Sequence, residues 1–179
     1  MTLDGVIEDP AAWAGPYLDD DFQKGALERL VATDAMLMGR RTYELLSRDW
    51  ANQSGDFANR INGIPKYVFS STLKSVQWRN ATIIENGLLA EVQRLKAQPG
   101  ADLAVYGHGR LAQTLLRNAL LDEVRISVFP VFVGHGQLLF REGESSALRL
   151  IEATALPTGV VVLRYCTGAV RARVSGSHD

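Results

Sequence analysis

Short apolar runs alternate with longer amphipathic segments along most of the chain, and this alternation predicts strands and helices in turn. The predicted strands are rich in apolar or β-branched residues and cover residues 35–38, 66–70, 82–84 and 103–106. The predicted helices have apolar side chains at helical spacing and cover residues 19–32, 41–46, 88–98 and 111–120. Strands that alternate with helices in this way are typical of a parallel sheet covered by helices.

The last third of the chain contains predicted strands but no further helices. A strand is expected over residues 124–133, with a bulge or bend at Pro130, because proline cannot donate to a ladder. Residues 148–155 and 159–166 are predicted to form a hairpin. We therefore predict one α/β domain over residues 1–167, with a mixed, mostly parallel sheet and an antiparallel C-terminal hairpin. Residues 168–179 are expected to form a polar C-terminal tail.

Size and charge limit the classes of partner. The chain has 179 residues, and its 19 basic and 20 acidic residues give a net charge of −1. Basic residues spread along the chain argue against a nucleic-acid partner. No apolar stretch approaches the ~18 residues of a membrane span, and acidic residues follow the start at once, which argues against a signal peptide. We therefore expect a cytoplasmic protein with no membrane association.

The single cysteine, Cys166, excludes an internal disulfide and is expected to be an inert buried thiol.

Three predicted strands end in turns of a kind that binds anions. The residues are Gly39, Arg40, Arg41 and Thr42 at the first turn, Ser70, Ser71 and Thr72 at the second, and Gly107, His108, Gly109, Arg110 and Leu111 at the third. Free N–H groups at a helix start attract anions, arginine offers a planar fork to phosphate, and glycine lets a pyrophosphate approach the backbone. Each turn alone could be only a tight turn, and His108 could face solvent as readily as a ligand. Ligands bind at the carboxyl ends of strands in open α/β sheets, so the three turns together favour a dinucleotide.

Other common sites are missing from the sequence. It contains no G-x-G-x-x-G, no phosphate-binding G-x-x-x-x-G-K-[ST] and no G-x-S-x-G nucleophile motif. Three histidines with one cysteine do not match a metal site. The acidic run at residues 19–21 either caps a helix or places a carboxylate at a pocket mouth.

Several of these segments resemble the riboflavin deaminase-reductase C-terminal domain family, which shares its fold with dihydrofolate reductase. The matching segments are residues 2–7, 39–44, 70–71, 107–111 and 121–125, followed by Pro130 and Gly134. The resemblance runs from residue 2 to about residue 167. It implies a dihydrofolate reductase-like three-layer fold with helices on both faces of the sheet, the cofactor NADPH and a homodimer.

The resemblance also implies roles for individual residues. The residues of the first turn would contact the cofactor phosphates, those of the second the adenosine end, and those of the third the pyrophosphate. Asp4 would face the nicotinamide–substrate cleft, and Asp21 lies about where dihydrofolate reductases keep their pteridine-binding carboxylate. Asp4 and Asp21 are therefore the candidate catalytic residues. Trp13, Tyr43 and Tyr106 are the candidate substrate contacts.

The sequence departs from the family pattern in three ways. Tyr106 stands where riboflavin-pathway reductases have the glutamate of a Glu-Gly-Gly sequence. The zinc deaminase half that accompanies those reductases is missing. The family also has a strand before residue 2, whereas Met1 begins at the motif, so the start is misassigned, the chain is truncated, or another segment fills that position.

Two functions follow from these observations. The first is an NADPH-dependent oxidoreductase that transfers a hydride to a small heterocycle of the pteridine or pyrimidine kind. It would resemble 5-amino-6-(5-phosphoribosylamino)uracil reductase domains without sharing their activity. The alternative is a non-catalytic, homodimeric module that binds NADPH or another nucleotide.

Overall fold

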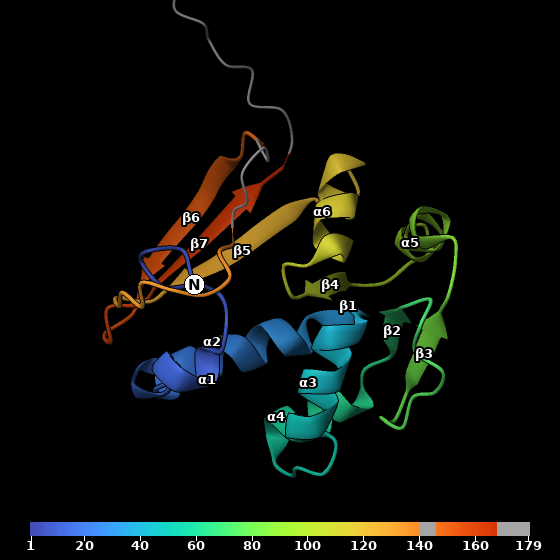
Figure 1. Ribbon diagram of the computed structural model, residues 1–179, viewed down its shortest axis with the longest axis horizontal. Helices are drawn as coiled ribbons and strands as arrows, with labels where there is room; N and C mark the ends of the chain where they lie inside the picture. Colours follow the sequence, from blue (N-terminus) through green and yellow to red (C-terminus); the bar gives the residue numbers. More distant parts are fainter. Residues whose placement is uncertain (140–145, 168–179) are drawn as a thin grey trace, which may run out of the picture. The chain divides into compact units, whose positions relative to one another are not determined.

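The computed structural model describes residues 1–139 and 146–167, and it divides the chain into two compact units (Figure 1). One unit consists of residues 20–120, and the other of residues 1–19 together with the chain from residue 121. The predicted tail, residues 168–179, lies outside the described residues, and the predicted domain boundary stays a prediction.

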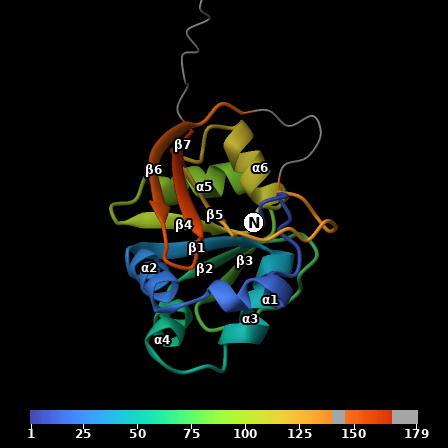
Figure 2. The same ribbon diagram turned by 90° about the vertical axis from the view of Figure 1, so that its left-hand side faces the viewer.

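Residues 20–120 form a parallel four-stranded sheet in the order β3-β2-β1-β4. Its strands are β1 (Thr33–Gly39), β2 (Lys66–Phe69), β3 (Ala81–Ile84) and β4 (Asp102–Tyr106). Its helices are α2 (Asp20–Val31), α3 (Arg40–Trp50), α4 (Asp56–Gly63), α5 (Leu88–Lys96) and α6 (Arg110–Arg117). Figure 2 shows α2, α3 and α4 on one face of this sheet and α5 and α6 on the other, which is the predicted layered arrangement.

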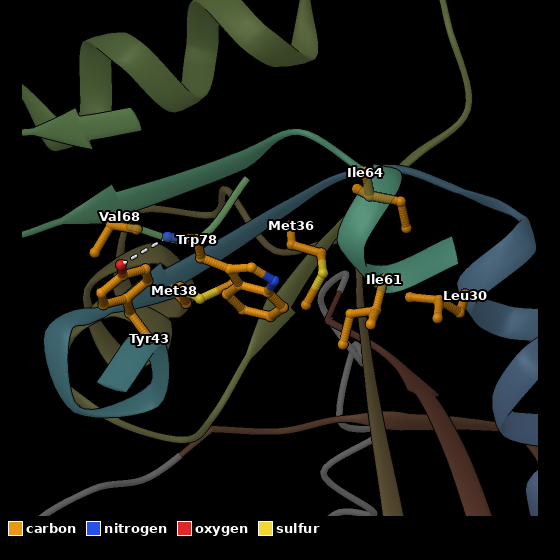
Figure 3. Close-up of a cluster of buried hydrophobic side chains, with 8 residues drawn as sticks. All are labelled: Leu30, Met36, Met38, Tyr43, Ile61, Ile64, Val68 and Trp78. Atoms are coloured by element: carbon orange, nitrogen blue, oxygen red, sulfur yellow. Dashed lines mark hydrogen bonds between the residues drawn. The ribbon is translucent and has the colours of Figure 1, made fainter. Parts of the chain in front are cut away.

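The core of this unit is built on β1. Residues 35–38 of this strand are all buried, as expected of a strand that is covered on both faces. Side chains from the strands and from three helices pack together on one face (Figure 3). These residues are Leu30, Met36, Met38, Tyr43, Ile61, Ile64, Val68 and Trp78.

Lys66, the first residue of β2, is buried beside this core and is only 1% exposed. Its Nζ donates to the carbonyl oxygens of Asn62 at 3.2 Å, Ile64 at 2.7 Å and Arg79 at 3.1 Å, and it lies 4.5 Å from the centre of the Trp78 ring. Burial, with a smaller contribution from the charge of Arg79, lowers the pKa of the Lys66 ammonium to about 8. The ammonium uses all three of its donors and ties the end of α4 to the start of β2.

The second unit contains an antiparallel sheet in the order β5-β7-β6. Its strands are β5 (Glu123–Val128), β6 (Arg149–Ala155) and β7 (Val161–Cys166), and two short helical turns, α1 (Pro10–Trp13) and η1 (Gly15–Tyr17), lie near the N-terminus. The predicted hairpin is therefore present. The strand β5 ends two residues before Pro130 and is shorter than predicted, because proline cannot continue the ladder.

The first three residues lie alongside the end of β5. Thr2 forms a parallel bridge with Phe129, the amide of Leu3 donates to the carbonyl of Val131 at 2.9 Å, and the amide of Phe129 donates to the carbonyl of Met1 at 2.8 Å. The Met1 amino group donates to the carbonyl of Ser127 at 2.6 Å, and burial lowers its pKa. Residues 1–3 therefore form a short parallel segment that pairs with the end of β5 and the residues after it.

The described helices are all too short or too polar to span a lipid bilayer. The cytoplasmic location expected from the sequence stays a prediction.

Replacing Lys66 by methionine removes the ammonium but keeps the length of the side chain. The three carbonyl oxygens then lose a buried donor, and we expect the free energy of unfolding at pH 7 to fall by about 2–4 kcal/mol. Urea denaturation followed by circular dichroism measures this change. Lys74→Met, at an exposed lysine, is the matched control and should cost less than about 0.5 kcal/mol. Equal losses in the two variants would contradict a structural role for Lys66.

The lowered pKa of Lys66 also predicts a pH dependence. Between pH 8 and the ordinary lysine pKa of 10.5, the unfolded chain holds a proton on this amine that the folded chain has lost. Stability rises with pH wherever the unfolded state binds more protons. The difference in unfolding free energy between the wild type and Lys66→Met should therefore increase from pH 8 to pH 10.5 in the same denaturation experiment. A difference that stays constant or shrinks would show that burial does not depress this pKa.

Candidate functional site

The three predicted anion-binding turns meet at one edge of the parallel sheet. In the register of β1 with its neighbours, Gly39 pairs with Phe69 of β2 and Met38 pairs with Tyr106 of β4. The turn after each strand therefore leaves the sheet at its carboxyl edge, and the turn after β1 lies between the other two. In open α/β sheets this edge is where ligands bind.

The two helices that start at this edge after β1 and β4 begin without negative charge. The N-cap residues of α3 and α6 are Gly39 and Gly109, which have no side chain to accept from the first N–H groups. Their first turns contain Arg40 and Arg41 in α3 and Arg110 in α6, with no acidic residue. By contrast, α2, α4 and α5 all have an acidic side chain in the first turn. A cation at a helix N-terminus opposes the helix dipole, so these two starts are suited to an external anion.

A close backbone approach joins the turn after β4 to the start of α3. Gly107 has a φ of +85°, and a Cβ atom added to it would lie 2.5 Å from Oγ1 of Thr42. No other residue fits this position without displacing Thr42, and the positive φ favours glycine in any case. Gly107 thus brings two of the three turns into contact.

Arg40 connects the start of α3 with the turn after β2. Its Nη1 donates to Oγ1 of Thr72 at 3.3 Å, and its Nε donates to Oε1 of Glu44 at 2.7 Å. The hydroxyl of Ser70 accepts from the amides of Thr72 at 3.2 Å and Leu73 at 3.0 Å, which shapes the turn. An exposed guanidinium beside an exposed hydroxyl is a suitable pair for a phosphate group.

The remaining residues of the predicted set differ in what they can offer a ligand. Arg41, Ser71 and Arg110 are exposed, and their side chains can reach solvent. His108 is half-buried. Leu111 is buried in the core, so only its backbone amide could contact a cofactor.

The candidate catalytic residue and the two candidate substrate contacts of this unit lie in different surroundings. Asp21 is exposed in the first turn of α2. Tyr106 is half-buried at the end of β4, and burial raises its pKa while the charge of Arg29 partly offsets that effect. Tyr43 is buried in the core, and its hydroxyl accepts from the amides of Gln77 at 2.9 Å and Trp78 at 3.3 Å. This environment gives Tyr43 a structural function.

Asp4 holds a turn of its own unit. Its carboxylate accepts from the hydroxyl of Thr2 at 2.5 Å and from the amides of Val133 and Gly134, the latter at 2.6 Å. The hydrogen bond from Thr2, then that from Gly134, lowers the pKa of Asp4. The carboxylate is therefore ionised at neutral pH, and it anchors residues 133–134 to the N-terminal segment.

Trp13 lies in the same unit as Asp4. Its indole N–H donates to the carbonyl of Glu8 at 3.0 Å, and its ring packs edge-on against Phe129 with the centroids 5.3 Å apart. Tyr17 packs against the same Phe129 ring at 6.0 Å. Trp13 thus belongs to a small aromatic cluster.

Glu44, the last residue of the matching segment 39–44, holds the guanidinium of Arg40, and no role was predicted for it. The spacing of four residues between an arginine and a glutamate on one helix was the available signal. Among the residues that the structure describes, no group of three or more His, Cys, Asp or Glu side chains could hold a metal ion.

Curated relatives match nearly the whole chain. The uncharacterized protein YyaP of Bacillus subtilis is 30% identical over 174 residues, which cover 92% of this chain and 90% of that protein. The uncharacterized protein YwjB of the same organism is 28% identical over 171 residues, which cover 92% of each chain.

Solved structures show the same fold. A Shewanella protein described as a candidate riboflavin biosynthesis protein has a TM-score of 0.73 at 23% identity, and the match covers 94% of this chain and 96% of that one. A pyrimidine reductase-like protein from Corynebacterium diphtheriae has a TM-score of 0.66 at 13% identity, with coverage of 93% and 88%.

A bifunctional deaminase and 5-amino-6-(5-phosphoribosylamino)uracil reductase from Thermotoga maritima has a TM-score of 0.64 at 12% identity, over 93% of this chain and 54% of that one. The sequence model of the RibD C-terminal domain family matches residues 1–162. With the order of the motifs and the layered α/β fold, this match shows that the chain belongs to the RibD C-terminal domain family.

Proposed function

We propose that the carboxyl edge of the parallel sheet binds NADPH and that the protein is an NADPH-dependent reductase of a small heterocyclic substrate. The observation that carries the proposal is the pair of glycine-capped, basic helix starts at α3 and α6. Two adjacent anion-binding starts suit the two phosphates of a dinucleotide better than they suit a single anion. Family membership supports the reductase class, and the sheet-edge residues support the cofactor.

The residues at this edge fit the parts of NADPH. The amides at the start of α3 and α6, with Arg41 and Arg110, would hold the pyrophosphate. Arg40 and Thr72, with Ser71 beside them, would hold the adenosine end and its 2′-phosphate, which distinguishes NADPH from NADH. When bound, the cofactor supplies the hydride, while the protein supplies position and electrostatics.

The substrate side of the proposed site includes Tyr106 and Asp21. Tyr106 is the residue of β4 nearest the third anion-binding turn, and Asp21 offers an exposed carboxylate on α2. Asp4, which belongs to the other unit, carries a negative charge rather than a proton, because its carboxylate accepts hydrogen bonds and its pKa is lowered. We propose a pteridine-like or pyrimidine-like heterocycle as the substrate, in line with the names of the structural relatives.

A second function, a non-catalytic module that binds NADPH, is supported by the directions in which the pKa values of Asp4 and Tyr106 are shifted. A general acid works best with a pKa near the working pH, whereas the pKa of Asp4 is lowered and that of Tyr106 is raised. Neither group is tuned for proton transfer at neutral pH. Loss of reduced-nicotinamide absorbance with a panel of pterins, pyrimidines and quinones supports the reductase. Cofactor binding without turnover of any of them supports the module.

Removing the basic side chains at the two helix starts tests the cofactor site. We expect Arg40→Ala and Arg110→Ala each to raise the Kd for NADPH by about 10- to 100-fold, because each removes a charge-assisted contact with phosphate. Quenching of protein fluorescence during NADPH titration measures the Kd. Arg48→Ala and Arg117→Ala, in the last turns of the same two helices, are the matched controls and should bind normally.

Two outcomes of this titration would contradict the proposal. One is the absence of NADPH binding by the folded wild type. The other is an equal loss of affinity in the controls and in the helix-start variants. If Arg40→Ala raises the Kd for NADPH but leaves the Kd for NADH unchanged, the 2′-phosphate binds at Arg40.

The close approach at Gly107 gives a separate prediction. Gly107→Ala adds a Cβ atom that collides with Thr42 and strains a positive φ, so we expect the unfolding free energy to fall by about 1–3 kcal/mol and NADPH affinity to fall with it. Gly109→Ala is the control, because its added Cβ meets no atom within 4 Å and its φ is −101°. Thermal unfolding compares the two variants, and the NADPH titration compares Gly107→Ala with the wild type. A larger loss in Gly109→Ala would contradict the argument.

A further inference from the structure

Arg40, at the start of α3, is shared by two neighbours of different chemistry. Its Nε donates to the carboxylate of Glu44 at 2.7 Å, and its Nη1 donates to the hydroxyl of Thr72 at 3.3 Å. Thr72 belongs to the turn after β2, whereas Glu44 lies one helical turn further along α3. The side chains of Arg40 and Glu44 are 48% and 47% exposed, and Thr72 is exposed as well. A ligand at the sheet edge can therefore reach all three groups.

The hydrogen-bonding groups of this ion pair are only partly used. Arginine has five N–H donors, and these two hydrogen bonds occupy two of them. Glu44 accepts through Oε1, and among the residues that the structure describes its Oε2 accepts no hydrogen bond. A carboxylate oxygen and several guanidinium N–H groups thus remain available to a ligand in one place.

A second arginine–glutamate pair, on α5, shows a closed arrangement. Arg94 donates from Nε to Oε2 of Glu91 at 2.9 Å and from Nη2 to Oε1 at 2.6 Å, so both carboxylate oxygens are occupied. Glu91 also precedes its arginine, whereas Glu44 follows Arg40, which is the less favourable order of charges along a helix. The order and geometry of the Arg40–Glu44 pair therefore favour a contact with a ligand over a contribution to helix stability.

The two charges of this pair suit the two forms of a nicotinamide dinucleotide. Arginine accommodates the 2′-phosphate on the adenosine ribose of NADPH, whereas an acidic side chain accepts from the 2′-hydroxyl that NADH has at the same position. Here both lie together, because Arg40 is hydrogen-bonded to Glu44 and to the turn after β2, where the adenosine end is proposed to bind.

The charge of Glu44 also opposes the 2′-phosphate. The guanidinium and the carboxylate together carry no net charge, so a phosphate has to share Arg40 with Glu44 and lies near a second negative charge. Like charges several ångströms apart on an exposed surface repel each other weakly, and we expect an effect on the Kd of about threefold to tenfold. A 2′-hydroxyl meets no such repulsion and gains a hydrogen-bond acceptor.

We propose that Glu44 determines the cofactor selectivity of this site. Its carboxylate accepts a hydrogen bond from the ribose 2′-hydroxyl of NADH and repels the 2′-phosphate of NADPH. The protein therefore binds both cofactors, and its preference for NADPH is smaller than Arg40 and Thr72 alone would give. This role of Glu44 rests on the proposed binding of a nicotinamide dinucleotide at the sheet edge.

Titration with NADPH and with NADH, followed by quenching of protein fluorescence, tests this role. Glu44→Gln keeps the size of the side chain but removes its charge. We expect this variant to lower the Kd for NADPH by about threefold to tenfold and to raise the Kd for NADH by about threefold or more. Asp49→Asn is the matched control, because it removes one negative charge from the last turn of the same helix. It should leave both Kd values within a factor of about two.

Two adenosine fragments separate the adenosine end of the cofactor from its nicotinamide end. Adenosine 2′,5′-bisphosphate has the 2′-phosphate, and AMP has the 2′-hydroxyl. Their dissociation constants, obtained by displacement of NADPH, should shift in the same opposite directions in Glu44→Gln, since neither fragment contains nicotinamide. Equal shifts for the two fragments would overturn the assignment of Glu44 to the adenosine ribose.

Opposite shifts for NADPH and NADH distinguish this role from a purely structural one. If Glu44 only held Arg40 in place, Glu44→Gln would weaken the binding of NADPH, and that outcome would overturn the proposal. Shifts no larger than those of Asp49→Asn, or a wild type that binds NADPH but not NADH, would also overturn it while leaving the proposed NADPH site standing. A wild type that binds neither dinucleotide would contradict the cofactor site itself, and this role with it.

Discussion

The parallel register of β1 with β2 and β4 determines where every residue at the sheet edge lies. Because β1 is buried on both faces and sits between its two neighbours, the turns that follow the three strands emerge side by side. The contact of Gly107 with Thr42 then fixes the turn after β4 against the first turn of α3. A shift of one residue in any of the three strands would separate the turns and turn core side chains toward solvent.

The electrostatics of this edge favour an anion in a way that the fold alone does not require. Helices that serve only to cover a sheet gain stability from an acidic first turn, and α2, α4 and α5 follow that rule. The first turns of α3 and α6 contain arginine and no acidic residue, so these two helices lack that stabilisation. A phosphate bound at these two helix starts would supply the negative charge that their first turns lack, and it would restore the missing stability. The unfavourable charges at these starts are thereby connected with the proposed function.

The strands, most helices and the three turns could be predicted from the sequence, since apolar periodicity and glycine at strand ends are local signals. The short helix α4 was missed because Asn59, Asn62 and Gly63 have low helix propensity and packing of Ala58 and Ile61 overrides it. The surroundings of Tyr43 and Asp4 could not be predicted, because the backbone amides that donate to them lie about 35 and 130 residues away. Their place in a motif did not reveal that hydrogen bonds already occupy both groups.

The claim at the centre of this account is that the amides at the starts of α3 and α6 hold the phosphates of NADPH. Hydrogen exchange of the backbone amides with and without saturating NADPH tests it most directly. Amides of residues 40–43 and 109–112 should become more protected, while those at the start of α5, whose first turn contains Glu91, should not change. Protection that spreads equally over all three helix starts, or its absence from α3 and α6, would contradict the account.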